Sequence, residues 1–313
     1  MTERQCPPIG VHAFAAGGLA RGALRYAAAV GAEAMQVFVS SPRSWALSPG
    51  DPGQDRALCD HVAAAGLPLF VHAPYLINVG SPDPLTRERS IASLAHSLRR
   101  GAEIGARGVV VHTGSAAGGD RDKSLRHVRD GLLPLLDSLP DGGPDLLLEP
   151  MAGQGQQLCR RVGDLGPYLA GLGWHPRAAV CLDTCHLFAA GHDLALPGGV
   201  AAAMDMLTAT LGTRGRLALV HANDSMDPCG SCRDRHQNLG KGQLGTAPFA
   251  ELLRHPVTSQ VPFIVETPGP EAAQAADVAT LKRLRGGLKH ERGEFVVTGD
   301  HKVTALTNYW PSW

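Results

Sequence analysis

The chain has 313 residues, 44% of them hydrophobic, and its 29 basic and 29 acidic side chains give a formal net charge of zero. This length allows one large domain or two small ones, and charged residues at 19% are too few for a disordered chain. The neutral balance argues against a protein that holds nucleic acid through bulk basicity, but it leaves a local site open.

No run of 18 or more apolar residues occurs, so we expect no transmembrane helix. Residues 1–8 lack the apolar core of a signal peptide, and we therefore expect a cytoplasmic location. The seven cysteines are scattered and odd in number, which favours free thiols over a disulfide framework. The 14 histidines are many for a chain of this length.

Eight short runs of strand-forming residues recur along the chain. The predicted strands are Ile9–Phe14, Met35–Ser40, Leu69–Pro74, Gly108–Gly114, Asp145–Pro150, Ala179–His186, Leu217–Asp224 and Pro262–Pro268. Parts of three runs, Phe38–Val39, Val109–Val111 and Leu146–Leu148, are apolar without alternation, which is typical of parallel strands buried on both faces.

Segments of helical length and pattern separate these strands, and several of them end in glycine, as helices often do. The predicted helices are Gly17–Gly31, Gln54–Gly66, Thr86–Gly105, Lys123–Leu139, Cys159–Gly171, Val200–Leu211, Pro248–His255 and Glu271–Gly286.

Eight alternating strands and helices predict an α/β protein with one (β/α)8 TIM-barrel domain over residues 1–286. The alternative is a doubly wound open sheet, which usually carries a G-x-G-x-x-G loop after its first strand. Residues 15–18 contain two glycines without that spacing, so the barrel is favoured. Residues 287–313 fall outside the alternation, and the sequence does not decide their structure.

Side chains that can bind metal follow six successive strands. Because barrel enzymes place their active sites at the carboxyl ends of the strands, these side chains should converge there. Imidazole and carboxylate ligands together suit zinc, and manganese less exclusively, and nine of them suit two or three ions. The candidates are His72, His112, Glu149, Asp183, His186, His221, Asp234, His236 and Glu266.

Several motifs around these residues resemble the endonuclease IV family, over about residues 9–286. Proteins of that family are zinc-dependent apurinic/apyrimidinic (AP) endonucleases with a tri-zinc centre in a TIM barrel of the xylose isomerase-like superfamily. The motifs are His72-Ala73-Pro74-Tyr75-Leu76-Ile77-Asn78, Ala152-Gly153-Gln154-Gly155, Asp183-Thr184-Cys185-His186, His221-Ala222-Asn223-Asp224-Ser225 and Asp234-Arg235-His236-Gln237-Asn238-Leu239-Gly240.

The resemblance implies how the nine candidates divide among three zinc ions, with manganese as a substitute at one site. Glu149 and Glu266 would be the catalytic carboxylates, and Glu149 would bridge the first two ions. The implied ligands are His72, His112 and Glu149 for the first ion, Glu149, Asp183, His221 and Glu266 for the second, and His186, Asp234 and His236 for the third.

The resemblance also implies the substrate and the reaction. The expected partner is double-stranded DNA with abasic sites, and the expected products are a 3′-hydroxyl and a 5′-deoxyribose phosphate. Arg43, Tyr75 and Leu76 would enter the duplex beside the abasic nucleotide. We expect a monomer that does not associate with membranes.

Several positions depart from the usual family pattern without removing a ligand. Pro150 and Met151 follow the bridging glutamate where the family usually has Asn-Thr, and Thr113 stands where proline is common. Cys232 stands where the family often has arginine, and Lys241 replaces a frequent glutamate.

Two other function classes remain open at this stage. A related barrel sugar isomerase or epimerase uses one or two metals, but it needs no third pair such as Asp234 and His236. A non-catalytic damage-binding or metal-storage protein would bind metal without turnover, and it has no need for Glu149 and Glu266 together.

Overall fold

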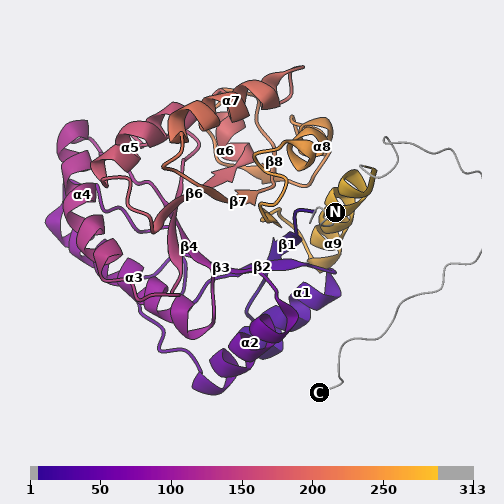
Figure 1. The fold of residues 1–313 in the computed structure, drawn as a ribbon, viewed down its shortest axis with the longest axis horizontal. Coiled ribbons are helices and arrows are strands. Elements are labelled where there is room, and N and C mark those ends of the chain that lie inside the picture. Colours follow the sequence, from indigo (N-terminus) through magenta and orange to yellow (C-terminus); the bar gives the residue numbers. More distant parts are fainter. Residues whose placement is uncertain (1–5, 288–313) are drawn as a thin grey trace, which may run out of the picture.

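The computed structural model describes residues 6–287, in which eight parallel strands form a closed barrel (Figure 1). The order around the barrel is β1-β10-β7-β6-β5-β4-β3-β2, and β1 closes it by pairing with both β10 and β2. The predicted TIM barrel is therefore confirmed. The strands are β1 Ile9–His12, β2 Ala34–Val37, β3 Leu69–His72, β4 Gly108–His112, β5 Asp145–Glu149, β6 Ala178–Asp183, β7 Leu217–His221 and β10 Phe263–Val265.

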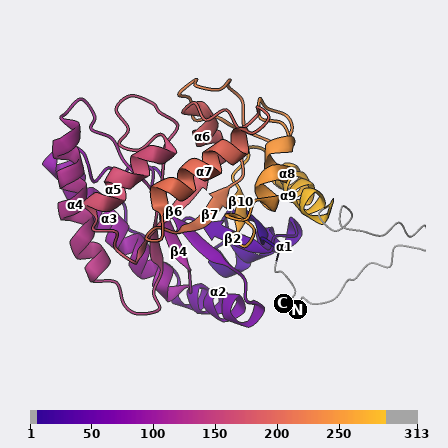
Figure 2. The same cartoon turned by 45° about the horizontal axis from the view of Figure 1, so that its top comes forward.

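Helices surround the barrel on the outside (Figures 1 and 2). Asp51, Asp83 and Asp120 begin three of them by accepting hydrogen bonds from backbone N–H groups of the first turn. No described helix is long and apolar enough to cross a membrane. The helices are η1 Leu19–Leu24, α1 Arg25–Ala29, α2 Pro52–Ala65, α3 Pro84–Glu103, α4 Arg121–Asp137, η2 Val162–Asp164, α5 Leu165–Gly171, α6 Thr184–Ala189, α7 Gly199–Leu211, α8 Ala247–Arg254 and α9 Glu271–Gly286.

The predicted boundaries differ from the structure mainly at the carboxyl ends of the strands. The strand predicted over Ala179–His186 ends at Asp183, because the Asp183 carboxylate accepts from the backbone N–H of His186 (3.0 Å) and begins α6. A two-stranded hairpin of β8 (Asp224–Ser225) and β9 (His236–Gln237) was not predicted. Residues 288–313, most of the predicted tail, lie outside the described part of the chain.

Two layers of side chains fill the barrel, one above the other. The lower layer is apolar and includes Ala34, Phe70, Val110, Leu147, Ala179, Cys181, Leu219 and Ile264. Because side chains alternate along a strand, the residue two positions further on points to the same interior. The residues at these next interior positions form the upper layer, which is polar. Its members are His12, Gln36, His72, His112, Glu149, Asp183, His221 and Glu266.

Candidate metal centre

Strand register brings the predicted ligands together at the carboxyl end of the barrel. His112 on β4 is the register partner of Glu149 on β5, and Asp183 on β6 is the partner of His221 on β7. Parallel neighbours lie about 4.8 Å apart, so partners at the strand ends present their side chains side by side. The barrel closure then places Glu266, which directly follows β10, beside β7.

Glu149 lies in the middle of four imidazole rings. Its Oε2 atom is 3.3 Å from Nε2 of His72 and 3.5 Å from Nε2 of His112. Its Oε1 atom is 3.1 Å from Nδ1 of His221 and 3.3 Å from Nδ1 of His186. One oxygen thus faces the two histidines predicted for the first ion and the other faces His221, predicted for the second, which is the arrangement that a bridging ligand needs.

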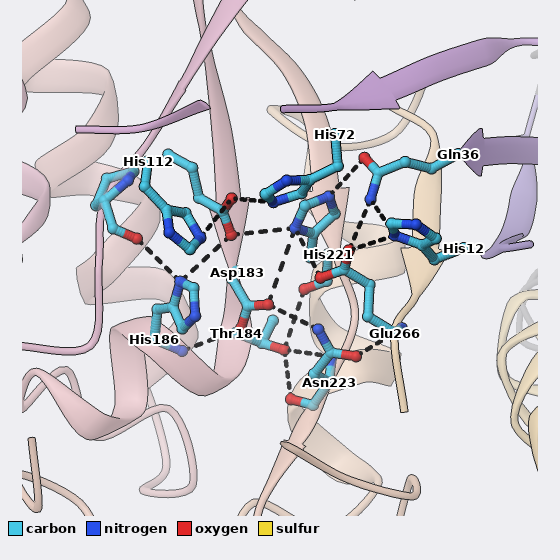
Figure 3. A network of polar contacts seen from close by, with 12 residues as sticks. His12, Gln36, His72, His112, Asp183, Thr184, His186, His221, Asn223 and Glu266 are labelled. Carbon is cyan, nitrogen blue, oxygen red and sulfur yellow. Dashed lines mark hydrogen bonds and ion pairs between the residues drawn. The ribbon is translucent and has the colours of Figure 1, made fainter. Parts of the chain in front are cut away.

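A second group gathers around His221 (Figure 3). Its Nδ1 atom lies 3.2 Å from Oε2 of Glu266 and 3.9 Å from Oδ2 of Asp183. Asn223 donates from Nδ2 to Oδ2 of Asp183 (2.6 Å), and its Oδ1 accepts from the backbone N–H of Glu266 (2.8 Å). Asn223 therefore orients the Asp183 carboxylate and anchors the backbone of Glu266.

The third group forms around Asp234, which the β8–β9 hairpin carries over the barrel. Its two carboxylate oxygens lie 3.2 Å from Nε2 of His186 and 3.2 Å from Nε2 of His236. Nε2 of His236 is also 3.5 Å from Oδ2 of Asp183, which connects this group with the second one. Each of the three predicted ligand groups is thus spatially contiguous.

Three of the histidines turn their other ring nitrogen toward a backbone carbonyl. The Nδ1 atoms of His72, His186 and His236 lie 2.7, 3.1 and 3.3 Å from the carbonyl oxygens of Ala73, Pro150 and Glu266. A proton on Nδ1 leaves the Nε2 lone pair directed into the centre. This pattern is the usual support of metal-ligating histidines.

The donor set fits metal ions. Oε2 of Glu149 is buried and has no hydrogen-bond partner, although two imidazole nitrogens lie within 3.5 Å of it. Within residues 6–287, no lysine or arginine forms an ion pair with the four predicted carboxylate ligands. Buried carboxylates without a cation are costly, and histidine with carboxylate is a donor set that suits zinc.

The electrostatics of the centre point the same way. Burial by itself would raise the pKa of Glu149, but the neighbouring His221 and His112 lower it well below its usual range. Burial would lower the pKa of His186, and the carboxylates of Asp183 and Asp234 instead raise it well above its usual range. The carboxylates thus favour positive charge within the buried centre, as a cation site requires.

Two cysteines lie close to the metal groups. Cys181 and Cys185 have sulfur atoms within reach of groups that could hold a metal. Burial raises the pKa of each thiol to about 12, so both are protonated at neutral pH. Cys181 belongs to the apolar layer of the barrel, and Sγ of Cys185 donates to the carbonyl of Arg235 (3.6 Å). These contacts give both residues a packing role.

Two residues of the polar layer, the partly buried His12 and the fully buried Gln36, were missed in the sequence. His12 and Gln36 lie at the ends of β1 and β2 as register partners, next to the Glu266 carboxylate. Gln36 is not a usual metal ligand, and His12 stands alone in its segment, so neither drew attention. Gly10 and Ala34 lie on the same strands, and the residues two positions after them, His12 and Gln36, must also face the barrel interior. This spacing is the sequence signal that could have identified them.

The three predicted DNA-contacting residues lie at the mouth of the centre. Tyr75 and Leu76 are 49% and 37% exposed, and Arg43 is exposed. The backbone N–H of Tyr75 donates to the carbonyl of Pro42 (3.0 Å), which joins the loops after β2 and β3. The Tyr75 ring also stacks on His112 with centroids 5.8 Å apart. These side chains are therefore accessible next to the first ligand group.

The departures from the family pattern leave the ligand geometry intact. At Pro150 the contact to His186 is made by the backbone carbonyl, so it does not depend on the side chain. The Thr113 hydroxyl donates to the carbonyl of Cys159 (3.3 Å), away from the ligands. Cys232 has a positive φ of 53°, and its N–H donates to the carbonyl of Ala189 (2.9 Å), which ties the loop before Asp234 to α6.

Comparison with known proteins identifies the family. The family model of the xylose isomerase-like TIM barrel matches residues 24–284. A curated relative from Streptomyces coelicolor, described as a probable endonuclease 4, is 55% identical over 282 residues, covering 90% of this chain and 96% of the relative. The chain belongs to the endonuclease IV family. A solved endonuclease IV from Thermus thermophilus is 33% identical with a TM-score of 0.78, covering 90% of this chain and 100% of that chain.

Sugar epimerases share the barrel with this endonuclease IV family member at much lower identity. A structure of L-ribulose 3-epimerase is 18% identical with a TM-score of 0.64, covering 91% of this chain and 94% of that chain. A match at this identity shows the fold alone. The sequence similarity to endonuclease IV therefore carries the family assignment, and the barrel by itself does not.

Proposed function

We propose that this chain is a DNA-repair endonuclease that hydrolyses the phosphodiester bond 5′ to an abasic site with three bound zinc ions. The observation that carries the proposal is the arrangement of the nine predicted ligands as three contiguous groups, joined through Glu149 and Asp183. The endonuclease IV relatives support the same reaction class.

The residues that would hold the ions follow from the distances. His72 and His112 share Oε2 of Glu149, while His221, Asp183 and Glu266 surround the space next to its Oε1. His186 and His236 share Asp234. Bound zinc would supply an activated water at neutral pH and would stabilise the charge that develops on the leaving oxygen. Manganese at one of the sites would serve the same purpose.

The chain itself would select the abasic nucleotide by shape. Such a nucleotide has lost its stacking and pairing, so turning it out of the duplex costs less than turning out a normal one. The exposed Arg43, Tyr75 and Leu76 would enter the duplex and fill the gap that the missing base leaves. Neutral net charge fits an enzyme that holds one distorted site rather than DNA in general.

An epimerase is the second candidate, because enzymes of that class share the fold. Such enzymes need one or two metals, so the group of His186, Asp234 and His236 would have no use there. A pure damage-binding protein would likewise have no need for a carboxylate such as Glu149 among four imidazole nitrogens.

Incision of a defined duplex tests the proposal. Purified protein with measured zinc content is incubated with a duplex that carries one tetrahydrofuran analogue of an abasic site. We expect a single cut 5′ to the analogue that leaves a 3′-hydroxyl, and no cut in the intact duplex. Absence of incision at full zinc loading would reject the endonuclease, and turnover of a ketose in the same preparation would favour the epimerase. Size-exclusion chromatography tests the expected monomer, and cell fractionation tests the expected cytoplasmic location.

A further inference from the structure

Gln36 is a fully buried amide in the polar layer, and glutamine is not among the usual zinc ligands. It lies on β2 opposite His12 of β1 in the strand register. A buried amide is costly unless its donors and acceptors are satisfied, and an apolar side chain of the same length would avoid that cost. The contacts of Gln36 therefore decide what it contributes.

Both ends of the amide contact predicted ligands of the second ion (Figure 3). Oε1 of Gln36 lies 3.0 Å from Nε2 of His221. Nε2 of Gln36 donates to Oε1 of Glu266 (2.6 Å) and lies 3.0 Å from Nδ1 of His12. The side chains of His221 and Glu266 are 0% and 12% exposed, so these contacts are largely shielded from water.

These neighbours permit only one orientation of the amide. If the amide were turned over, its oxygen would face the Glu266 carboxylate at 2.6 Å, and two acceptors would meet. In the observed orientation Oε1 accepts a hydrogen bond from the N–H at Nε2 of His221. The lone pair of that ring then lies on Nδ1, which is 3.1 Å from Oε1 of Glu149 and 3.2 Å from Oε2 of Glu266.

The support of His221 differs in kind from that of the other histidines. His72, His186 and His236 turn their outer nitrogens toward backbone carbonyls, which any residue at those positions would provide. His221 instead depends on the side chain of Gln36. The same amide holds Oε1 of Glu266 and leaves its Oε2 toward Nδ1 of His221.

We propose that Gln36 is a positioning residue of the metal centre: it sets the tautomer of His221 and the orientation of Glu266, so that both present ligand atoms to the second ion. The inference rests on the proposed function only in requiring that metal binds here. It does not require that DNA is cleaved. Partners of this kind outside the ligand set typically contribute roughly 10- to 100-fold to metal affinity.

The test compares Gln36→Met with Gln274→Met. Both changes replace a buried glutamine by an apolar side chain of similar length, but Gln274 contacts the Tyr26 hydroxyl and the Thr267 carbonyl instead of ligand side chains. Zinc is titrated away with a chromophoric chelator in the absence of DNA. We expect Gln36→Met to release one ion at a chelator concentration roughly 10- to 100-fold lower than wild type requires, and Gln274→Met to behave as wild type.

Two results would overturn the inference. One is a wild-type zinc affinity in Gln36→Met, and the other is an equal loss of affinity in Gln274→Met, which would indicate a general packing effect. If Gln36→Met does not fold, Gln36→Glu serves instead, since it keeps an acceptor for His221 but sets a carboxylate against Glu266. Weakened zinc binding in that variant supports the inference, and unchanged binding rejects it. Zinc affinity is measured without DNA. The test of Gln36 therefore remains valid even if the wild-type protein does not cut abasic DNA.

Discussion

Glu149 contacts four imidazole nitrogens through its two oxygens, and no other predicted ligand meets as many. Glu149→Gln keeps the shape of the side chain but removes its negative charge. Since outer partners of a metal ligand alone contribute roughly 10- to 100-fold, we expect incision to fall by at least about 100-fold. The measurement is the single-turnover incision rate together with zinc content. Incision at the wild-type rate would disprove the bridging role.

Tyr75 is exposed next to the ligands and packs against them at the same time. Its ring stacks on His112 and meets His72 edge-on, with centroids 5.8 and 5.4 Å apart. We expect Tyr75→Ala to weaken binding to abasic duplex by roughly tenfold, the equivalent of about 1.4 kcal/mol and within the range of one base–aromatic stack, and to affect intact duplex less.

Met206 offers a control for this change, because it is similarly exposed at 44% but lies on the outer helix α7. Met206→Ala should leave binding to both duplexes unchanged. Fluorescence anisotropy with labelled duplexes measures both variants. Equal losses on abasic and intact DNA in Tyr75→Ala would contradict a role in recognising the missing base.

At the residue level, candidate ligands are easier to find in the sequence than the groups that would support them. Histidine and carboxylate at strand ends are chemically conspicuous, so the nine candidates could be identified from residue type and position. The support of His186 is a backbone carbonyl at Pro150, and the support of His221 is an amide far away in sequence. Neither is visible without the strand register that brings them into contact.

The β8–β9 hairpin carries Asp234 and His236, which are predicted ligands of the third ion, and an ion pair braces it. Arg235 donates from Nε and Nη2 to the two oxygens of Asp227 at 2.6 and 2.5 Å. Arg233 reaches the same carboxylate only at 3.8 Å. The two arginines thus carry the same charge, but only Arg235 makes close hydrogen bonds to Asp227.

This difference gives a matched pair of variants. We expect Arg235→Ala to loosen the segment that holds Asp234 and His236 and to weaken the binding of one zinc ion by several-fold, because Arg235 makes two charge-assisted hydrogen bonds to Asp227. Arg233→Ala should have little effect. Chelator titration without DNA measures both, so that contacts of either arginine with phosphate do not enter. A larger effect of Arg233→Ala would refute the bracing role.

Elements with strong periodicity were predicted well, and short ones were not. The helix predicted over Glu271–Gly286 has the observed bounds, because its pattern extends over several turns. Helix α6 was taken as part of the preceding strand, since the apolar run continues through Asp183 and the switch depends on one capping hydrogen bond. Strands β8 and β9 have two residues each, too few for any pattern.

At the scale of the whole molecule, Glu33 ties the last helix to the start of the barrel. Its carboxylate accepts from both Nη atoms of Arg285 on α9 and from the backbone N–H of Ile9 on β1. Lys282 of the same helix lies 3.2 Å from it. Burial would raise the pKa of Glu33, but the Arg285 hydrogen bonds and the other contacts outweigh burial and lower it to about 2.

This shift predicts how the stability contribution of Glu33 depends on pH. The folded-state pKa is depressed, so the contribution is present above the unfolded value near 4.5 and is lost as the pH falls toward about 2. Since the side chain is 35% exposed, we expect Glu33→Gln to lower the free energy of unfolding by only about 1 kcal/mol at pH 7. Urea unfolding of the metal-free protein at a series of pH values measures it.

The matched control is Glu88→Gln, at an exposed position on α3. The difference between wild type and Glu33→Gln should shrink as the pH falls from about 5 to about 2, and Glu88→Gln should show no such trend. A difference that stays constant over this range would mean that Glu33 stabilises the barrel by packing and not by its charge.

The two stacked layers of the barrel restrict how this protein can change over evolutionary time. Each strand presents an apolar residue and, two positions later, a member of the polar layer. Insertion or deletion of one residue within a strand turns every following side chain of that strand to the opposite face. A predicted ligand would then point outward, and its neighbour would take its place in the barrel. Length variation should therefore be confined to loops and outer helices, while the strands should keep a fixed count between the two layers.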